Sequence, residues 1–137
     1  MSTTIRTEIS KNSPYYISKH RYLELKHFCL QYKEWENKWR NIPVISENEI
    51  GKIPGGKNPK KPTEDLAIKK MTLERNMRMV WAVCKEADDS IADYIFKSVT
   101  EGVSFVWLST HTDIPCGKDL FYDRYRKFFW MLDAVRR

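Results

Sequence analysis

Apolar residues recur at steps of three and four along most of this chain, which is the spacing of one face of an α-helix. Residues 18–40 carry such a face, made of Tyr22, Leu25, Cys29, Tyr32, Trp35 and Trp39. Residues 63–100 carry a second, which begins with Leu66, Leu73, Met77, Val80, Cys84 and Ala87. The last helical face consists of Phe121, Tyr125, Phe128, Leu132 and Val135. No segment is rich in strand-forming residues, so the pattern predicts an all-α fold.

Capping and helix-breaking residues divide these stretches. The expected helix starts are Ser13-Pro14, where proline suits the first helical position, and Thr63, a good N-cap. Asp88-Asp89-Ser90 predicts a break followed by a new cap, and Gly102 predicts a helix end. Thr112 to Gly117 contains a proline and a glycine, and therefore predicts a turn.

These caps and breaks predict a flexible arm (1–13), a helical bundle (14–40 and 63–102), a loop or linker (41–62) and a separate C-terminal segment (103–137). The 41–62 segment contains four prolines and three glycines, which exclude a regular helix. Two interpretations of it stay open. It is a tether between helical parts, or its residues Lys57, Lys60 and Lys61 bind a phosphate backbone.

The charge distribution permits a polyanionic partner, which would bind at the two basic ends of the chain. The 137 residues have a net charge of +6, with 12 basic and 6 acidic residues in 1–62. Residues 63–102 hold 6 basic and 8 acidic residues, whereas residues 103–137 hold 6 and 4. Three separated cysteines predict reduced thiols, and no apolar run is long enough for a membrane span. We therefore expect a cytoplasmic protein, without a membrane partner.

The C-terminal segment has the layout of a helix-turn-helix. Ser104 caps a short helix whose expected inner face is Phe105, Val106 and Leu108, and the turn offers Ile114 as an apolar anchor. A longer amphipathic helix follows from Lys118. In a helix-turn-helix, this second helix enters the major groove of DNA.

Rotation by about 100° per residue places Asp119, Tyr122, Asp123 and Arg126 opposite the apolar face of that helix. Lys118, Tyr122 and Arg126 are the candidates for base contacts, because arginine can donate two parallel hydrogen bonds to guanine. The candidates for phosphate contacts are Arg124, Lys127, Arg136 and Arg137. Asp119 and Asp123 oppose this interpretation unless they accept a hydrogen bond from cytosine or are held by neighbours, as Lys127 could hold Asp123. A protein-binding helical module therefore stays open.

Two segments carry a resemblance to a known family. The run from Ile114 to Phe129 (IPCGKDLFYDRYRKFF) resembles the C-terminal helix-turn-helix of small phage-encoded proteins from Gram-positive bacteria, which are related to the ArpU and RinA late-gene transcription regulators. Their C-terminal domain is similar to the promoter-recognition region of sigma factors. Tyr15 to Tyr32 also resembles phage proteins of this kind. The resemblance implies a cytoplasmic DNA-binding regulator from a mobile element in a bacterial host.

No constellation of residues predicts catalysis, a metal or a cofactor. His20, Glu24 and His27 share one helix side, but a di-iron bundle needs a second copy of that motif. His111 and Cys116 lie near one turn without a third group to orient the histidine. The five tryptophans mostly fall on apolar stripes, so we expect them in the core or in an interface.

The sequence thus predicts a sequence-specific transcription regulator that binds double-stranded DNA and is not an enzyme. A homodimer and host RNA polymerase are possible further partners. Two alternatives stay open, a small packaging-type protein that recognises phage DNA and an inhibitor that binds a nucleic-acid-guided host defence protein.

Overall fold

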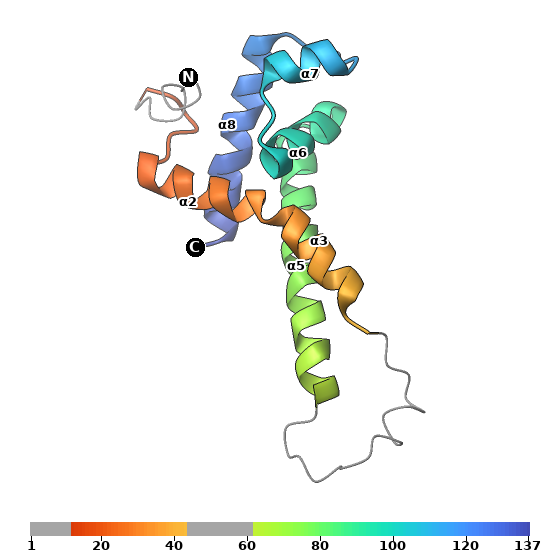
Figure 1. Cartoon of the computed structure of the whole chain (residues 1–137). Helices are drawn as coiled ribbons and strands as arrows, with labels where there is room; N and C mark the ends of the chain where they lie inside the picture. Colours follow the sequence, from red (N-terminus) through yellow and green to blue (C-terminus); the bar gives the residue numbers. More distant parts are fainter. Residues whose placement is uncertain (1–11, 44–61) are drawn as a thin grey trace.

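The computed structural model describes residues 12–43 and 62–137, and every regular element within them is helical, as the apolar periodicity predicts (Figure 1). The α-helices are α2 (Lys19–Leu30), α3 (Tyr32–Asn41), α5 (Pro62–Ala87), α6 (Ala92–Glu101), α7 (Phe105–His111) and α8 (Lys118–Val135), with a 3₁₀ helix η1 (Asp89–Ile91) before α6. The expected loop 41–62 lies mostly outside the described residues.

The single helix expected over 18–40 is two helices, because the chain breaks at Gln31. The Gln31 amide N–H donates to the carbonyl of Phe28 at 3.3 Å, and its side-chain amide donates to the carbonyl of His27. The Gln31 side chain thus bonds the His27 carbonyl, which in an uninterrupted α-helix would accept from the backbone N–H of Gln31. The break lets Phe28 of α2 and Trp35 of α3 meet, with ring centroids 4.8 Å apart.

Local capping explains where the helices begin and end. Ser13-Pro14 forms a turn and not a helix entry; α2 begins at Lys19, where the Ser18 hydroxyl accepts from the amide of Arg21. The helix α5 begins at Pro62, one residue before the expected cap at Thr63. The expected end at Gly102 is confirmed, since this residue has a left-handed φ of 75°.

The core lies where α2, the C-terminal half of α5, α6 and α8 meet. Its largest fully buried side chains include Tyr22, Leu25, Ile95, Phe128 and Leu132, which come from three of these helices. At its centre the hydroxyls of Tyr22 and Tyr125 lie 2.9 Å apart. Burial of each large apolar side chain stabilises the fold by about 1.5–3 kcal/mol. This core joins the expected bundle and the C-terminal segment into one packed unit.

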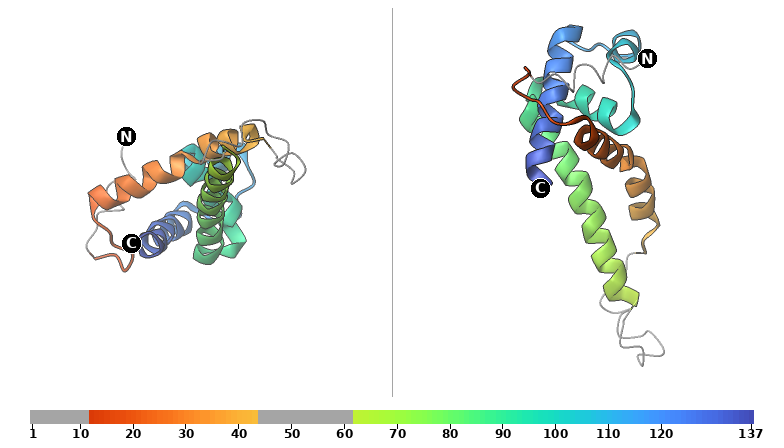
Figure 2. Two further views of the ribbon diagram at one scale, coloured as in Figure 1. Left: turned by 90° about the horizontal axis from the view of Figure 1, so that it is seen from below. Right: turned by 90° about the vertical axis from the view of Figure 1, so that its left-hand side faces the viewer.

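The N-terminal half of α5 projects from this core (Figures 1 and 2). Only α3 accompanies it, whereas α2, α6, α7 and α8 lie around the opposite half of the molecule. The apolar stripe expected on α5 faces the body, and it is fully buried only from Val80 onward.

Three expected buried residues are exposed. Val106 lies on the solvent side of the short helix α7, with 63% of its surface exposed, because Leu108 and Phe105 occupy the packed side. Val135 is exposed at the last turn of α8, beyond the reach of the neighbouring helices. Trp130 is 44% exposed, and its ring packs beside that of Tyr15 with centroids 5.7 Å apart. Among the described residues, no helix is long and apolar enough to cross a membrane.

Candidate nucleic-acid interface

The candidate interface is the outer surface of α8 near its N-terminus, which we define as Lys118, Asp119, Asp123, Arg126 and Lys127. Asp119, Asp123 and Arg126 share one helix side because they are spaced by four and three positions, and Lys118 and Lys127 lie at its two margins. The apolar residues Phe121, Tyr125 and Phe128 are buried on the other side and fix the rotation of the helix. Of the predicted DNA-binding residues, Asp123 and Arg126 thus lie on the outer side of α8, and Lys118 and Lys127 flank it.

The N-terminus of α8 is open. Its cap is Gly117, which makes no side-chain cap hydrogen bond, and a Cβ added there would meet no atom within 4 Å. Lys118, Asp119 and Leu120 are exposed in the first turn. Figure 1 shows this end beside α7, away from the crossing of α2 over α8. Among the described residues, no other helix covers the first turn of α8.

Tyr122 connects α7 to α8. It is half-buried, and its hydroxyl accepts a hydrogen bond of 3.2 Å from the backbone amide of Phe105, at the first turn of α7. Its ring contacts Phe121 and Tyr125 at centroid distances of 5.1 and 5.7 Å. The sequence pattern placed Tyr122 on the outer face, whereas the structure places it at the edge of that face, against α7.

Arg124 is held by carboxylates. Its Nε donates to Asp88 Oδ2 at 3.0 Å, and its guanidinium also contacts Asp123. This pairing raises the pKa of Arg124, mainly through the hydrogen bond with Asp88. The Asp88 carboxylate also accepts bonds from the hydroxyl and amide of Ser90, at 2.6 and 3.0 Å. These bonds, led by the one from the Ser90 hydroxyl, lower the pKa of Asp88.

Asp123 therefore has partners other than the one its spacing suggests. The expected pair with Lys127 is replaced by contacts with Arg124 and with Arg126, whose guanidinium lies 3.9 Å from Asp123 Oδ1. The Arg126 side chain is 21% exposed. A carboxylate with two arginine neighbours presents less negative charge to an approaching phosphate than an unpaired one would.

The two C-terminal arginines lie at the far end of α8, about 27 Å along the helix from Lys118 at a rise of about 1.5 Å per residue. The Arg136 guanidinium carbon lies 3.6 Å from the Phe28 ring centroid, and Arg137 lies 3.4 Å from Asp133. Asp133 also binds Arg21 at 2.7 Å. Arg136 and Arg137 thus stand apart from the outer surface of α8, and Lys57, Lys60 and Lys61 lie outside the described residues.

The polar side chains considered for catalysis or metal binding have local partners or lie apart. His111 stacks on Trp107 with centroids 4.2 Å apart, and its Nδ1 lies 2.9 Å from the Trp107 carbonyl. His20, Glu24 and His27 are exposed on α2. In the described parts of the chain, no three His, Cys, Asp or Glu side chains are placed to hold one metal ion.

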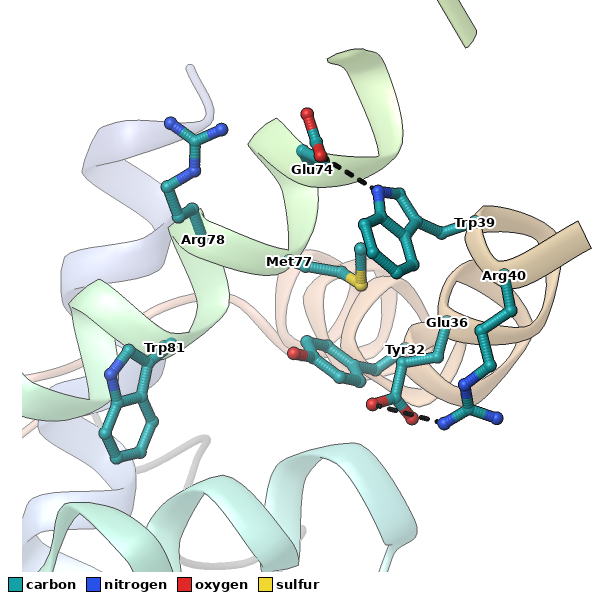
Figure 3. Close-up of a pocket in the computed structure, with 8 residues that line it drawn as sticks. All are labelled: Tyr32, Glu36, Trp39, Arg40, Glu74, Met77, Arg78 and Trp81. Carbon is teal, nitrogen blue, oxygen red and sulfur yellow. Dashed lines mark hydrogen bonds and ion pairs between the residues drawn. The ribbon is translucent and has the colours of Figure 1, made fainter. Parts of the chain in front are cut away.

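A second feature, which the sequence did not predict, is a pocket of about 400 Å³ between α3 and α5 (Figure 3). Its walls are Tyr32, Trp39, Met77 and Trp81, and its charged residues are Glu36, Arg40, Glu74 and Arg78. The indole N–H of Trp39 donates to Glu74 Oε2 at 2.9 Å, and Arg40 lies 4.0 Å from Glu36. In the sequence, the only sign of this pocket is that its lining residues are spaced i, i+4, i+7 on each helix. That spacing indicates a pocket only when the pairing of α3 with α5 is known.

No family model, curated protein or solved structure matches this chain. The geometry of the molecule therefore carries the functional argument.

Proposed function

We propose that this protein is a sequence-specific DNA-binding regulator of a phage or mobile element, which acts by binding and catalyses no reaction. In this proposal α7, residues 112–117 and α8 act as a helix-turn-helix, and the N-terminal half of α8 enters the major groove. The observation that carries it is the exposed first turn of α8, from Lys118 to Leu120, beside an open helix N-terminus. The resemblance to the relatives of ArpU and RinA points to the same class.

Base recognition is assigned to Lys118 and Arg126. Lys118 is exposed in the first turn of α8, and Arg126 lies about two turns further along the helix, on the outer side that Lys118 flanks. Asp123 holds the Arg126 guanidinium loosely at 3.9 Å, so this arginine keeps donors for guanine O6 and N7. Tyr122 takes a positioning role, because its hydroxyl fixes the start of α7 against α8.

Phosphate binding is assigned to Lys127 and to the α8 N-terminus. Such contacts fix the position of the protein on DNA and carry no sequence information. The pairing of Asp88 and Asp123 with arginines reduces the repulsion that their carboxylates would exert on the phosphates. Arg124 serves this pairing and is assigned no DNA contact of its own.

The experiment is selection of bound sequences from a random double-stranded DNA library, followed by affinity measurements at two salt concentrations. Arg126→Ala should weaken binding to the selected sequence by about tenfold to a hundredfold, with little effect on random DNA. Lys127→Ala should weaken binding to the selected sequence and to random DNA alike. It should also reduce the number of ions released on binding, measured from the slope of log affinity against log salt, by about one. Lys19→Ala removes an equal charge from an exposed position on α2 and is the matched control.

Two outcomes would overturn the proposal: no sequence is enriched, or Arg126→Ala binds the selected sequence as tightly as the parent. Specific binding to a host protein in the absence of DNA, abolished by the same substitution, would instead assign this surface to an inhibitor.

A further inference from the structure

The exposed side of α5 carries a second regular stripe, separate from the side packed on the body. Glu64, Ile68, Met71, Arg75, Arg78 and Ala82 follow one another at steps of four and three, and all are exposed. Met71 and Ile68 expose 67% and 59% of their surface, whereas Val80 on the packed side is fully buried. Alternating steps of four and three are the spacing of a helix that packs along a partner helix.

We propose that this stripe binds the same stripe of a second copy, with the two α5 helices antiparallel. The twofold axis would pass between Lys69 and Lys70, so that Ile68 of each copy meets Met71 of the other. An isologous interface of this kind requires a surface that is complementary to itself. The proposal does not depend on DNA binding.

Charge complementarity identifies the second copy as the occupant. Glu64 lies four residues before Ile68, and Arg75 lies four residues after Met71. In the antiparallel arrangement, Glu64 of each copy therefore faces Arg75 of the other, which gives two ion pairs around an apolar centre. A parallel arrangement would place Glu64 against Glu64 and Arg75 against Arg75, which is repulsive.

The surroundings of the axis leave room for a second helix. The amino group of Lys70 lies 4.9 Å from the Trp39 ring centroid, so this side chain turns toward the body. Beside Ile68, an apolar groove of about 610 Å³ opens between α3 and α5, with Ile42, Leu66 and Leu73 among its lining residues. Side chains of the second copy can bury apolar surface there. The half of α5 that carries the stripe projects from the body with only α3 beside it (Figures 1 and 2).

The test is sedimentation equilibrium of the full chain over a wide concentration range, at low salt. The parent should form a dimer, and Ile68→Asp should weaken it by at least about tenfold. Val106→Asp is the matched control, because Val106 is similarly exposed but lies on α7. Circular dichroism of each variant checks that the helices are retained.

A charge exchange makes the test specific for the antiparallel arrangement. Glu64→Arg and Arg75→Glu should each weaken the dimer by about tenfold, because each places like charges together. The double variant should recover to within about threefold of the parent, because both pairs re-form in reverse. A parent that remains monomeric, a dimer that tolerates Ile68→Asp, or a double variant as weak as the two single variants would overturn the proposal.

Discussion

Asp88 shows how much structure one side chain can organise. It accepts two hydrogen bonds from Ser90, which start the 3₁₀ helix η1, and one from Arg124 of α8. It therefore fixes the corner between α5 and α6 and joins that corner to α8. The Asp88 side chain is mostly covered, so this ion pair is less screened by solvent than the exposed pairs on α2 and α3.

The lowered pKa of Asp88 makes stability depend on pH. The ionised form is favoured in the folded state, so its contribution is present above the unfolded pKa of about 3.9 and is lost as the pH falls further. Asp88→Asn keeps a capping oxygen but removes the charge. We expect it to lower the free energy of unfolding by about 1 kcal/mol at pH 7. We also expect the free energy of unfolding of Asp88→Asn to fall less than that of the parent when the pH is lowered.

Urea unfolding of both proteins at neutral pH and at about pH 3 measures these quantities. Asp89→Asn, at the exposed neighbouring position, is the control. Equal losses of stability on acidification in the parent and in Asp88→Asn would show that the Asp88 pair does not carry this dependence.

At the scale of helices, the apolar periodicity predicts the elements and most of their packed faces. The break at Gln31 was not predictable, because neither proline nor glycine marks it. It depends on a local amide bond to His27 and on the packing of Phe28 against Trp35. The exposure of Val106 was also not predictable, because α7 has only seven residues and its apolar spacing does not define one buried side.

Substitution of two glycines at helix ends should change the stability of the protein in opposite directions. Gly102 ends α6 with a φ of 75°, which strains any L-residue, although an added Cβ would meet only Leu30 at an ordinary 3.5 Å. Gly117 begins α8 with an extended backbone and open space around it. We expect Gly102→Ser to destabilise by about 1 kcal/mol and Gly117→Ser, which supplies a cap, to stabilise by about 0.5 kcal/mol.

Thermal unfolding of the two serine variants measures this difference, and each variant serves as the control for the other because the chemical change is the same. Equal shifts in Tm would refute the assignment of backbone strain to Gly102 and of an unfilled cap to Gly117.

At the scale of the whole molecule, the outer surface of α8 could be predicted in part from the sequence. Helix rotation identified Lys118, Arg126 and Lys127, because it needs only the position of the apolar face. It could not find the Arg124–Asp88 pair, which joins residues 36 positions apart. Nor could it find the α3–α5 pocket, since its residues come from two helices whose pairing is set by the fold.

The two proposals together predict the spacing of DNA half-sites. From the proposed axis to Ala87, each α5 runs about 26 Å at a rise of about 1.5 Å per residue, so the two C-terminal ends lie about 52 Å apart. Figure 1 places α7 and the N-terminal end of α8 beyond this end of α5. A dimer of this shape spans more than one turn of DNA, which is about 34 Å, and approaches two turns. We therefore expect half-sites about 21 base pairs apart.

Duplexes with two copies of the selected half-site, placed about 10, 16 or 21 base pairs apart, test this spacing because only the matched separation lets a dimer hold both sites. The longest spacing should give the tightest binding, and Ile68→Asp should remove that advantage while leaving binding to a single half-site unchanged. Preference for about 10 base pairs would show that the dimer binds DNA through another arrangement of its subunits, and the antiparallel α5 interface would then have to be abandoned for the DNA-bound state.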